Sequence, residues 1–334
     1  MAHPVTLLSV TVPTYNRAVL LDYFLEVHAP VFQRHGVPIY IADNASDDGT
    51  EQVCLRWSQK FDVIRVHRFE DHVEPDQSFH RALTLPRSRY VWLIGDGYEV
   101  SEAMLLRALN LLATGGDYDH VTTNLISLSD AKVGREYRDR SEVAKDLPWL
   151  MTCMSCHIYS ERLLAHSRFE RFFGTYFLQA GIALDFMRFD DFSFFFSPEI
   201  SVVTLKCPNY RKVGWGSHYF EVCFYRFPKL IFMLYEHLSV ADQVNALRNF
   251  FLHTPIFGWR HLLNMRAQGT LCASAFTAHR STISTLTPLR FQFVLRSLLL
   301  LPKSLAVALS TFIEFLRTHH YRLRRRLGLW QDGK

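Results

Sequence analysis

The sequence predicts an α/β protein, with a Rossmann-like domain over residues 1–130, a less regular segment after it and a mainly helical C-terminal region. In the first third of the chain, apolar runs rich in β-branched residues alternate with segments of helical periodicity. This alternation is typical of right-handed βαβ units and of a parallel sheet covered on both faces. Polar clusters also follow three of the expected strands, where ligands bind in sheets of this kind.

Each of the first two expected strands is followed by a helix. Leu7–Val12 is a β-branched apolar run that Pro13 closes, which predicts a buried strand. Residues 17–35 place apolar side chains at helical spacing and end near a glycine. Val37–Ala42 predicts a second strand, and Thr50–Lys60 predicts a second helix with one apolar side.

The remainder of the first domain repeats this pattern. Val63–His67 predicts a third strand, and residues 76–85 predict a short helix after an acidic loop. Tyr90–Ile94 predicts a fourth strand, which a glycine-containing turn closes. A helix at residues 101–113 and a strand at residues 119–126 complete the domain.

The second half of the chain has a weaker pattern. Residues 130–146 are charged and lack periodicity, which predicts a loop or linker. Residues 220–265 and 288–326 are rich in Phe and Leu and are expected to be mainly helical. The predicted domains are residues 1–130, 131–225 and 226–334.

Positive charge is concentrated at the C-terminal end. The net charge is +5, and residues 287–334 contribute +7 through nine Lys/Arg against two acidic residues, which leaves −2 for the remainder. This distribution fits a basic tail and does not fit a basic domain face for nucleic acid. No nucleic-acid partner is therefore expected.

The N-terminus lacks the pattern of a secretory signal, so we expect a reducing cytoplasm and free thiols at the six cysteines. Cys153–His157 matches the C-x-x-C-H pattern of covalent haem attachment and also half of a zinc site. Haem attachment of that kind requires export, and the sequence has no second C-x-x-C. Buried, unligated cysteines are therefore expected in this segment.

Three polar clusters stand at the ends of expected strands. Pro13–Arg17 follows the first strand, Asp43–Thr50 the second and Gly95–Tyr98 the fourth. A carboxylate such as Asp43 can accept hydrogen bonds from a nucleobase or from ribose hydroxyls, and Asp96 can hold a divalent cation that neutralises a diphosphate. Part of the second cluster also fits a turn and N-cap that opens the next helix, a role that needs no ligand.

Together the three clusters resemble the family-2 inverting glycosyltransferases of the GT-A fold, of the bacterial surface-polysaccharide type. The resemblance covers residues 5–130, where order and spacing agree as well as composition, and it is faint beyond residue 150. It implies a GT-A sheet that binds a nucleotide-diphospho-sugar, with Asp43 at the base and Asp96 at the first position of the D-x-D motif, near Mg²⁺ or Mn²⁺. The residues that it implies for donor binding are Pro13, Thr14, Tyr15, Arg17, Asp43, Asn44, Asp96 and Gly97, and the implied metal ligand is Asp96.

Two positions depart from the family pattern. Tyr98 takes the place of the second D-x-D carboxylate, and the adjacent Glu99 would point to the other side of a continuing strand. The family usually supplies its base from a Glu-Asp pair, which deprotonates the acceptor hydroxyl, and Gln179 stands at the nearest matching position. Asp185 and Asp191 are candidate bases by residue type, with solvated or helix-capping carboxylates as the alternative.

Residues 209–218 combine two cations, two glycines, aromatic residues and a histidine. Arg211, Lys212 and His218 are expected to contact the donor from a mobile loop that closes over the diphosphate and excludes water. An ordinary basic surface loop is the alternative.

Residues 289–326 form an apolar segment with a basic end. The longest uncharged run, Ser304–Ile313, is much shorter than the roughly 20 residues that span a bilayer. Interrupted by Pro302 and followed by arginines, the segment fits a helix that lies in the headgroup region of an anionic leaflet. Two core-packing helices are the alternative. We therefore expect a cytoplasmic protein, peripheral on the inner face of the cell membrane.

The leading hypothesis is a glycosyltransferase that moves one sugar from a nucleotide-sugar donor to a glycan or lipid-linked glycan acceptor. A non-catalytic GT-A-fold binding protein is the alternative that Tyr98 and Gln179 favour. A nucleotidyltransferase usually carries a Gly-rich basic loop after the first strand, and a dehydrogenase carries G-x-G-x-x-G there. Pro13–Arg17 matches neither motif.

Overall fold

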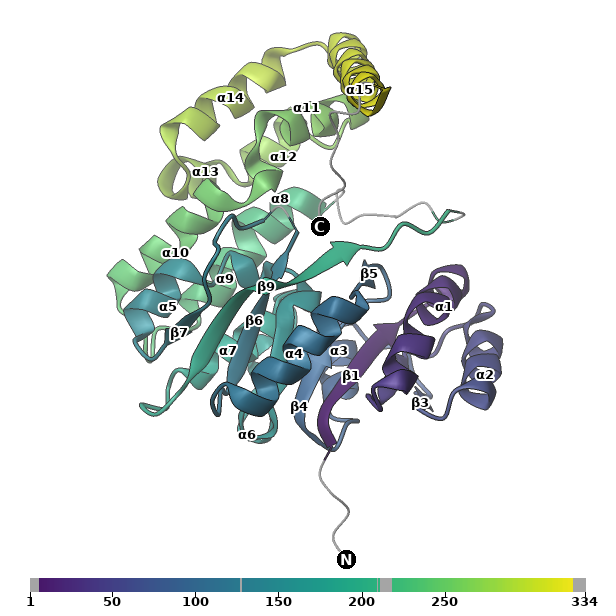
Figure 1. Ribbon diagram of the computed structural model, residues 1–334. Helices are drawn as coiled ribbons and strands as arrows, with labels where there is room; N and C mark the ends of the chain where they lie inside the picture. The colour runs from purple at the N-terminus through teal and green to yellow at the C-terminus, as the bar shows by residue number, and fades with distance from the viewer. Residues whose placement is uncertain (1–5, 127, 209, 211–217, 327–334) are drawn as a thin grey trace, which may run out of the picture. The chain divides into compact units, whose positions relative to one another are not determined.

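The computed structural model describes residues 6–126, 128–208, 210 and 218–326, with side chains in the last helix described as far as residue 316 (Figure 1). The chain divides into two compact units. The first consists of Met1–Val213 with Arg226–Phe250, and the second consists of Gly214–Tyr225 with Phe251–Lys334.

The first unit is built on a mixed sheet with the strand order β3-β2-β1-β4-β8-β6-β9-β5, and β7 pairs with β9. The first four strands in this order are parallel, β8 is antiparallel to both of its neighbours, and β6 and β9 are again parallel. The strands are β1 (Thr6–Thr14), β2 (Ile39–Asp43), β3 (Ile64–Arg68), β4 (Ser88–Leu93), β5 (Tyr98–Glu99), β6 (His120–Leu125), β7 (Arg135–Tyr137), β8 (His157–Ser160) and β9 (Phe194–Thr204).

Helices cover both faces of this sheet, and α4 crosses in front of the strands in Figure 1. One face packs on α1, α2 and α4 through an apolar cluster that includes Val10, Val12 and Trp92. On the opposite face, the hydroxyl of Thr11 donates to the carbonyl oxygen of Ala82 in α3 at 2.8 Å. The helices are α1 (Ala18–Arg34), α2 (Thr50–Lys60), α3 (Pro75–Leu83), α4 (Glu102–Thr114), α5 (Arg140–Asp146), α6 (Glu161–Ala165), α7 (Leu178–Phe186), α9 (Phe227–Phe232) and α10 (Val240–His253).

The sequence located all the strands and helices between residues 6 and 125 except the short β5. A parallel sheet was expected for the first third of the chain, where β1, β2, β3 and β4 are indeed parallel. The strand β8 comes from beyond that region and lies antiparallel between β4 and β6. Residues 130–146 were expected to be a loop or linker, which was wrong, because they contain β7 and α5, and the side chain of Asp139 caps α5. Because β6, β8 and β9 complete the same sheet, the predicted boundary at residue 130 is not a boundary between compact units.

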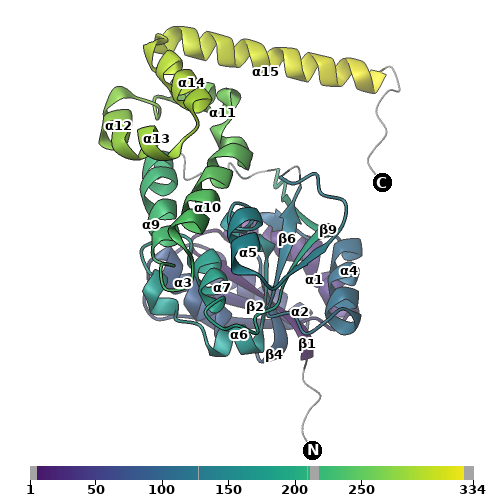
Figure 2. The same ribbon diagram turned by 90° about the vertical axis from the view of Figure 1, so that its left-hand side faces the viewer.

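The second unit is helical, as expected. Its aromatic core includes Phe224 stacked on Phe251 with ring centroids 5.4 Å apart, and Phe257 edge-on to Phe291 at 5.6 Å. Figure 2 shows α15 as one long helix. The helices are α8 (Tyr219–Glu221), α11 (Trp259–Gln268), α12 (Ala273–Ala278), α13 (Arg280–Leu286), α14 (Leu289–Leu300) and α15 (Lys303–Arg326). Among the described residues, no single helix is long and apolar enough to cross a membrane, and only α14 and α15 together pass that test, with a bend of 115° between them.

A buried histidine fixes α1 beside the segment that follows β5. The Nδ1–H of His28 donates to the carbonyl oxygen of Phe24 at 2.7 Å, and its Nε2 accepts the N–H of Val100 at 3.0 Å. Both ring nitrogens are therefore satisfied only in the neutral ring. Burial lowers the pKa of His28 to about 4 from an ordinary value of 6.5.

The buried histidine predicts acid sensitivity of the fold. Between pH 6.5 and about 4 the unfolded chain binds a proton at His28 that the folded protein does not, so stability falls as the pH falls through this window. The full window corresponds to about 3 kcal/mol. His28→Gln should flatten the pH dependence of the unfolding free energy, measured by urea unfolding between pH 4.5 and 7. An unchanged slope would show that this ring does not set the dependence.

Candidate active site

A cavity of about 480 Å³ opens at the carboxyl ends of β1, β2 and β4. It lies where ligands bind in open α/β sheets, and its volume falls within the roughly 300–1,000 Å³ typical of ligand sites. The residues that line it are Pro13, Thr14, Tyr15, Arg17, Asn44, His72, Val73, Glu74, Pro75, Ser78, Phe79, Gly95, Asp96, Gly97, Tyr98 and Met154.

The ends of β1 and β4 meet at the carboxylate of Asp96, which is 1% exposed. The guanidinium of Arg17 donates to Asp96 Oδ1 at 2.8 Å, and the hydroxyl of Thr14 donates to Oδ2 at 3.0 Å. The charge of Asp96 raises the pKa of Arg17, so this guanidinium remains a cation. Asp96 is therefore a buried anion with a cation already bound to it.

At the end of β2, Asp43 is buried beneath the cavity and is not among the residues that line it. Its Oδ1 accepts both the backbone N–H and the hydroxyl of Ser46, at 3.0 and 2.5 Å. Its Oδ2 accepts from the guanidinium of Arg68 at 3.2 Å. The described contacts of Asp43 thus hold the turn that carries Asn44.

Asn44 joins this turn to the loop that follows β3. Its Nδ2 donates to the carbonyl oxygen of Val73 at 2.8 Å, and the N–H of Val73 donates to its Oδ1 at 3.1 Å. The rings of Tyr15 and His72 lie 4.0 Å apart across the same wall. Sequence reasoning missed the part of the wall between residues 72 and 79. The available signal was that this loop follows β3, the parallel neighbour of β2.

Left-handed backbone shapes the two strand ends. Asn16 has φ 51° and Ala45 has φ 59°. The side chain of Asn16 accepts the N–H of Asp47 at 2.9 Å, which ties the two turns together. Asp48 accepts the N–H of Ala18, the first residue of α1, at 3.0 Å, and also bonds the N–H of Thr50. Asp48 therefore caps helices, the structural role that the sequence had left open.

Tyr98, which stands where the family has a second carboxylate, lines the cavity from β5. The Cys153 thiol, and then burial, raise the pKa of this phenol well above its ordinary range, so Tyr98 is neutral. Cys153 and Cys156 are buried, and none of the six cysteines, all of which the structure describes, forms a disulfide. Among the described residues that line the cavity, Asp96 and Glu74 are the carboxylates.

Residues 9–168 match the family described as Glycosyl transferase family 2. The matched stretch is just under half of the chain, and it is similar to a family-2 glycosyltransferase domain. Abequosyltransferase RfbV of Salmonella typhimurium is 29% identical over 110 residues, which are 32% of this chain and 32% of that protein. The matched region thus spans about a third of the length of this curated relative.

Solved structures share the fold of this glycosyltransferase domain at low identity. Mannosyltransferase PcManGT from Pyrobaculum calidifontis, in complex with GDP-Man and Mn²⁺, has a TM-score of 0.54 at 14% identity, with 99% of this chain and 92% of that chain covered. S. aureus TarS 1–349, in complex with UDP-GlcNAc, has a TM-score of 0.53 at 15% identity, with coverage of 86% and 84%. These likenesses confirm the predicted GT-A fold.

Gln179 lies beyond the stretch that matches the family, at the position where the resemblance implies the catalytic base. Gln179 is buried near the start of α7, and its amide donates to the carbonyl oxygen of Thr152 at 3.3 Å. Asp76 of α3 accepts the N–H groups of Tyr176 and Leu178, at 2.9 and 3.2 Å, and so fixes the turn before α7. The position is thus well ordered, but a glutamine amide cannot accept a proton as a base.

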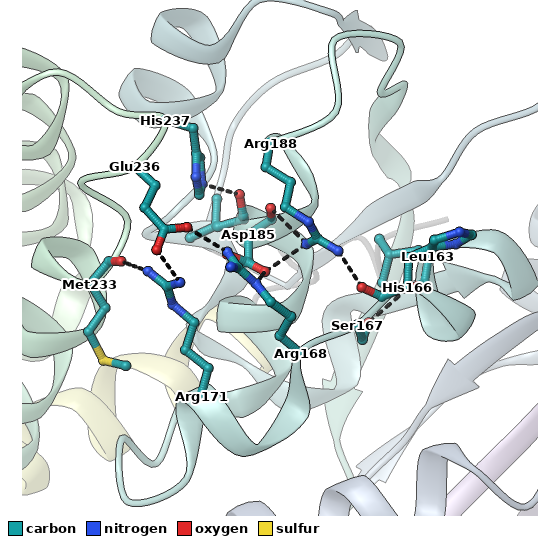
Figure 3. A network of polar contacts seen from close by, with 11 residues as sticks. Leu163, His166, Ser167, Arg168, Arg171, Asp185, Arg188, Met233, Glu236 and His237 are labelled. Carbon is teal, nitrogen blue, oxygen red and sulfur yellow. Dashed lines mark hydrogen bonds and ion pairs between the residues drawn. The ribbon is translucent and has the colours of Figure 1, made fainter.

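The base candidate Asp185 is fully buried and is not among the residues that line the cavity. Its Oδ1 and Oδ2 bind Arg168 at 2.5 and 2.9 Å, and Oδ2 also binds Arg188 at 2.7 Å (Figure 3). Glu236 and His237 lie close enough to share a metal ion with Asp185. However, Glu236 is itself ion-paired with Arg168 and Arg171, and so many guanidinium groups oppose a cation there. This network joins the segment after α9 to the sheet.

The remaining predicted site residues lie elsewhere. Asp191 is exposed, forms an ion pair with Arg162 at 2.6 Å and is not among the residues lining the cavity. Arg211 and Lys212 lie outside the described residues. His218 belongs to the second unit, with its Nδ1 3.7 Å from Glu221. The structure therefore brings Pro13, Thr14, Tyr15, Arg17, Asn44, Asp96 and Gly97 together, with Asp43 beneath them.

The substitution Asp185→Asn should lower the stability of the fold. The substitution keeps the shape but removes the charge that pairs with Arg168 and Arg188, so the free energy of unfolding should fall by roughly 2 kcal/mol or more. Urea unfolding measures the change, and Asp191→Asn is the matched control on an exposed carboxylate, expected to leave the unfolding midpoint in place. Loss of turnover in Asp185→Asn without any loss of stability would instead support the role of base.

Proposed function

We propose that this chain is an inverting glycosyltransferase that moves one sugar from a nucleotide-sugar donor to a glycan or lipid-linked glycan in surface-polysaccharide biosynthesis. The observation that carries the proposal is the cavity at three strand ends of a family-2 domain, lined by seven of the eight donor-binding residues that the family resemblance implies, Asp43 being the exception. RfbV, an abequosyltransferase, supports transfer of a sugar. PcManGT and TarS, which hold GDP-Man and UDP-GlcNAc, support a nucleotide-sugar donor.

Each wall of the cavity suits one part of such a donor. The rings of Tyr15 and His72 offer a surface on which a nucleobase can stack. Asn44 and the turn held by Asp43 form the polar edge beside them. Arg17 offers a planar, permanently charged group that fits a diphosphate. A contact of Arg211 and Lys212 with the diphosphate stays a prediction from the sequence, because both residues lie outside the described part of the chain.

A divalent cation, Mg²⁺ or Mn²⁺, is proposed as the cofactor, because PcManGT holds Mn²⁺ together with its nucleotide sugar. Of the two carboxylates that line this cavity, Asp96 and Glu74, Asp96 is the one that the family resemblance implies as the metal ligand. Mg²⁺ commonly binds one carboxylate together with substrate phosphates and water. The donor set therefore fits a cation that enters with the diphosphate. When bound, the cation would neutralise the departing nucleoside diphosphate.

The reaction is a displacement in which the acceptor oxygen bonds to the anomeric carbon and the bond to the diphosphate breaks. The acceptor proton must pass to a base. Asp185 and Asp191 are the sequence candidates for that role, and the contacts of both are with arginines instead. Gln179 and Tyr98 also favour a second candidate function, a GT-A-fold protein that binds a nucleotide sugar without turnover. A turnover assay separates the two functions.

The acceptor side is proposed to lie at an anionic membrane surface on the cytoplasmic face, with residues 289–326 in contact with it. On α15, exposed apolar side chains recur at positions i, i+4, i+7 and i+11, which places them on one side of the helix. The apolar residues of this surface on α14 and α15 are Leu289, Phe293, Leu300, Leu305, Leu309, Phe312 and Leu316. Arg290, Arg296 and Lys303 supply positive charge beside it, as binding to anionic lipid requires.

Thermal unfolding with a panel of nucleoside diphosphates and nucleotide sugars tests the donor site. A ligand at a hundred times its Kd stabilises the folded protein by about 2.7 kcal/mol. One nucleotide family should raise the Tm of the native protein, and Asp43→Ala and Asp96→Ala should abolish the shift. Asp190→Ala, an exposed change outside the cavity, is the control that should retain it. No shift with any nucleotide would contradict the proposed function.

Vesicle sedimentation tests the membrane surface. Phe312→Glu with Leu316→Glu places two charges in the apolar stripe of α15 and should lower binding to phosphatidylglycerol vesicles by about tenfold or more. Val307→Glu, an exposed position on the other side of α15, is the matched control and should bind as the native protein does. Equal binding of all three proteins to the vesicles would contradict the proposal that this surface contacts the membrane.

A further inference from the structure

Asp96 requires a positive partner whether or not a donor is bound. Its carboxylate is 1% exposed, and a buried carboxylate without a compensating charge is strongly destabilising. Arg17 provides that charge at 2.8 Å, and Thr14 hydrogen-bonds the second oxygen. Tyr98, the neutral phenol of the same cavity, cannot replace the cation.

Arg17 is able to leave this carboxylate. Its side chain is 43% exposed, whereas that of Asp96 is 2% exposed, so the guanidinium can reach the cavity while the carboxylate stays in place. Arg17 also lies just before α1, and its side chain makes no capping hydrogen bond to that helix. Among the described residues that line the cavity it is the one Arg or Lys, and it is therefore the cation there that can bind a diphosphate.

We propose that Arg17 and a divalent cation exchange on Asp96 when the donor binds. Without a donor, Arg17 neutralises Asp96 and keeps the metal out. The diphosphate draws the guanidinium to its own oxygens, and the divalent cation then takes the carboxylate and the remaining phosphate oxygens. The inference rests on the proposed function, since it describes how the same cavity loads its donor.

The exchange has a thermodynamic consequence. A single carboxylate that is already ion-paired gives a divalent cation too few ligands, so the metal alone should bind weakly. The diphosphate both removes the competing guanidinium and adds oxygen ligands. Nucleotide and metal should therefore bind cooperatively, each raising the affinity of the other by the same factor.

Direct Mn²⁺ binding, followed by electron paramagnetic resonance with and without UDP or GDP, tests the exchange. In the native protein the nucleotide should tighten Mn²⁺ binding by about tenfold or more. Arg17→Gln should bind Mn²⁺ more tightly than the native protein when no nucleotide is present, and Mn²⁺ should raise its Tm by restoring the missing charge. Arg34→Gln, which breaks an ion pair with Glu102 at the other end of α1, is the matched control and should behave as the native protein.

Two further variants, Arg17→Lys and Asp96→Asn, test the same exchange. Arg17→Lys retains a cation if Arg17→Gln is too unstable to purify. Its Mn²⁺ affinity should exceed that of the native protein, because an ammonium is more strongly hydrated than a guanidinium and pairs less well with a buried carboxylate. Asp96→Asn should lose Mn²⁺ binding with and without nucleotide.

Mn²⁺ affinity that is the same in the native protein and in both Arg17 variants would overturn the exchange, as would Mn²⁺ binding that survives in Asp96→Asn. Nucleotide binding that is equally tight in EDTA and in Mn²⁺ would overturn the exchange and leave the donor site standing. The donor site on which the proposed function rests would fail if no nucleotide bound under any of these conditions.

Discussion

A buried carboxylate at the end of β4 determines how the donor side of this molecule is organised. Asp96 can remain ionised there only because β1 lies directly beside β4, so that the residues after both strands meet. Thr14 and Arg17, from the end of β1, satisfy its two oxygens. Asn44 and the turn held by Asp43 close the adjoining edge through the parallel pairing of β1 with β2. The cavity follows from this meeting of strand ends.

The two halves of the sheet differ in how closely their residues follow the family pattern. The parallel half, up to β4, holds the cavity and the residues that the family resemblance implies for the donor. The mixed half is joined to it by Asp76, which fixes the turn before α7. In that half Gln179 stands where the resemblance implies the base, and Asp185 belongs to an ion-pair network. One departure from the family pattern thus lies in the mixed half, and the other, Tyr98, lines the donor cavity.

The sequence predicted the helices and strands that depend on local periodicity, and it missed features that depend on contacts between residues far apart in the chain. The helix at Thr50–Lys60 was placed to the residue, and the meeting of Thr14 with Asp96 followed from the rule that parallel strand ends share an edge. The position of β8 could not be predicted, because its partners β4 and β6 lie far from it in sequence and its run of four residues carries no clear period. Asp185 has the residue type of a base, and only the fold reveals that two arginines surround it.

Turnover is the most direct test of the central claim. The measurement is the transfer of radiolabelled sugar, together with release of nucleoside diphosphate, when the protein is incubated with a panel of nucleotide sugars and lipid-linked glycan acceptors. A glycosyltransferase releases one nucleoside diphosphate for each sugar transferred, with one donor preferred over the others. Tight binding of a nucleotide sugar without transfer or release would contradict the enzymatic account and identify a donor-binding protein on the same fold.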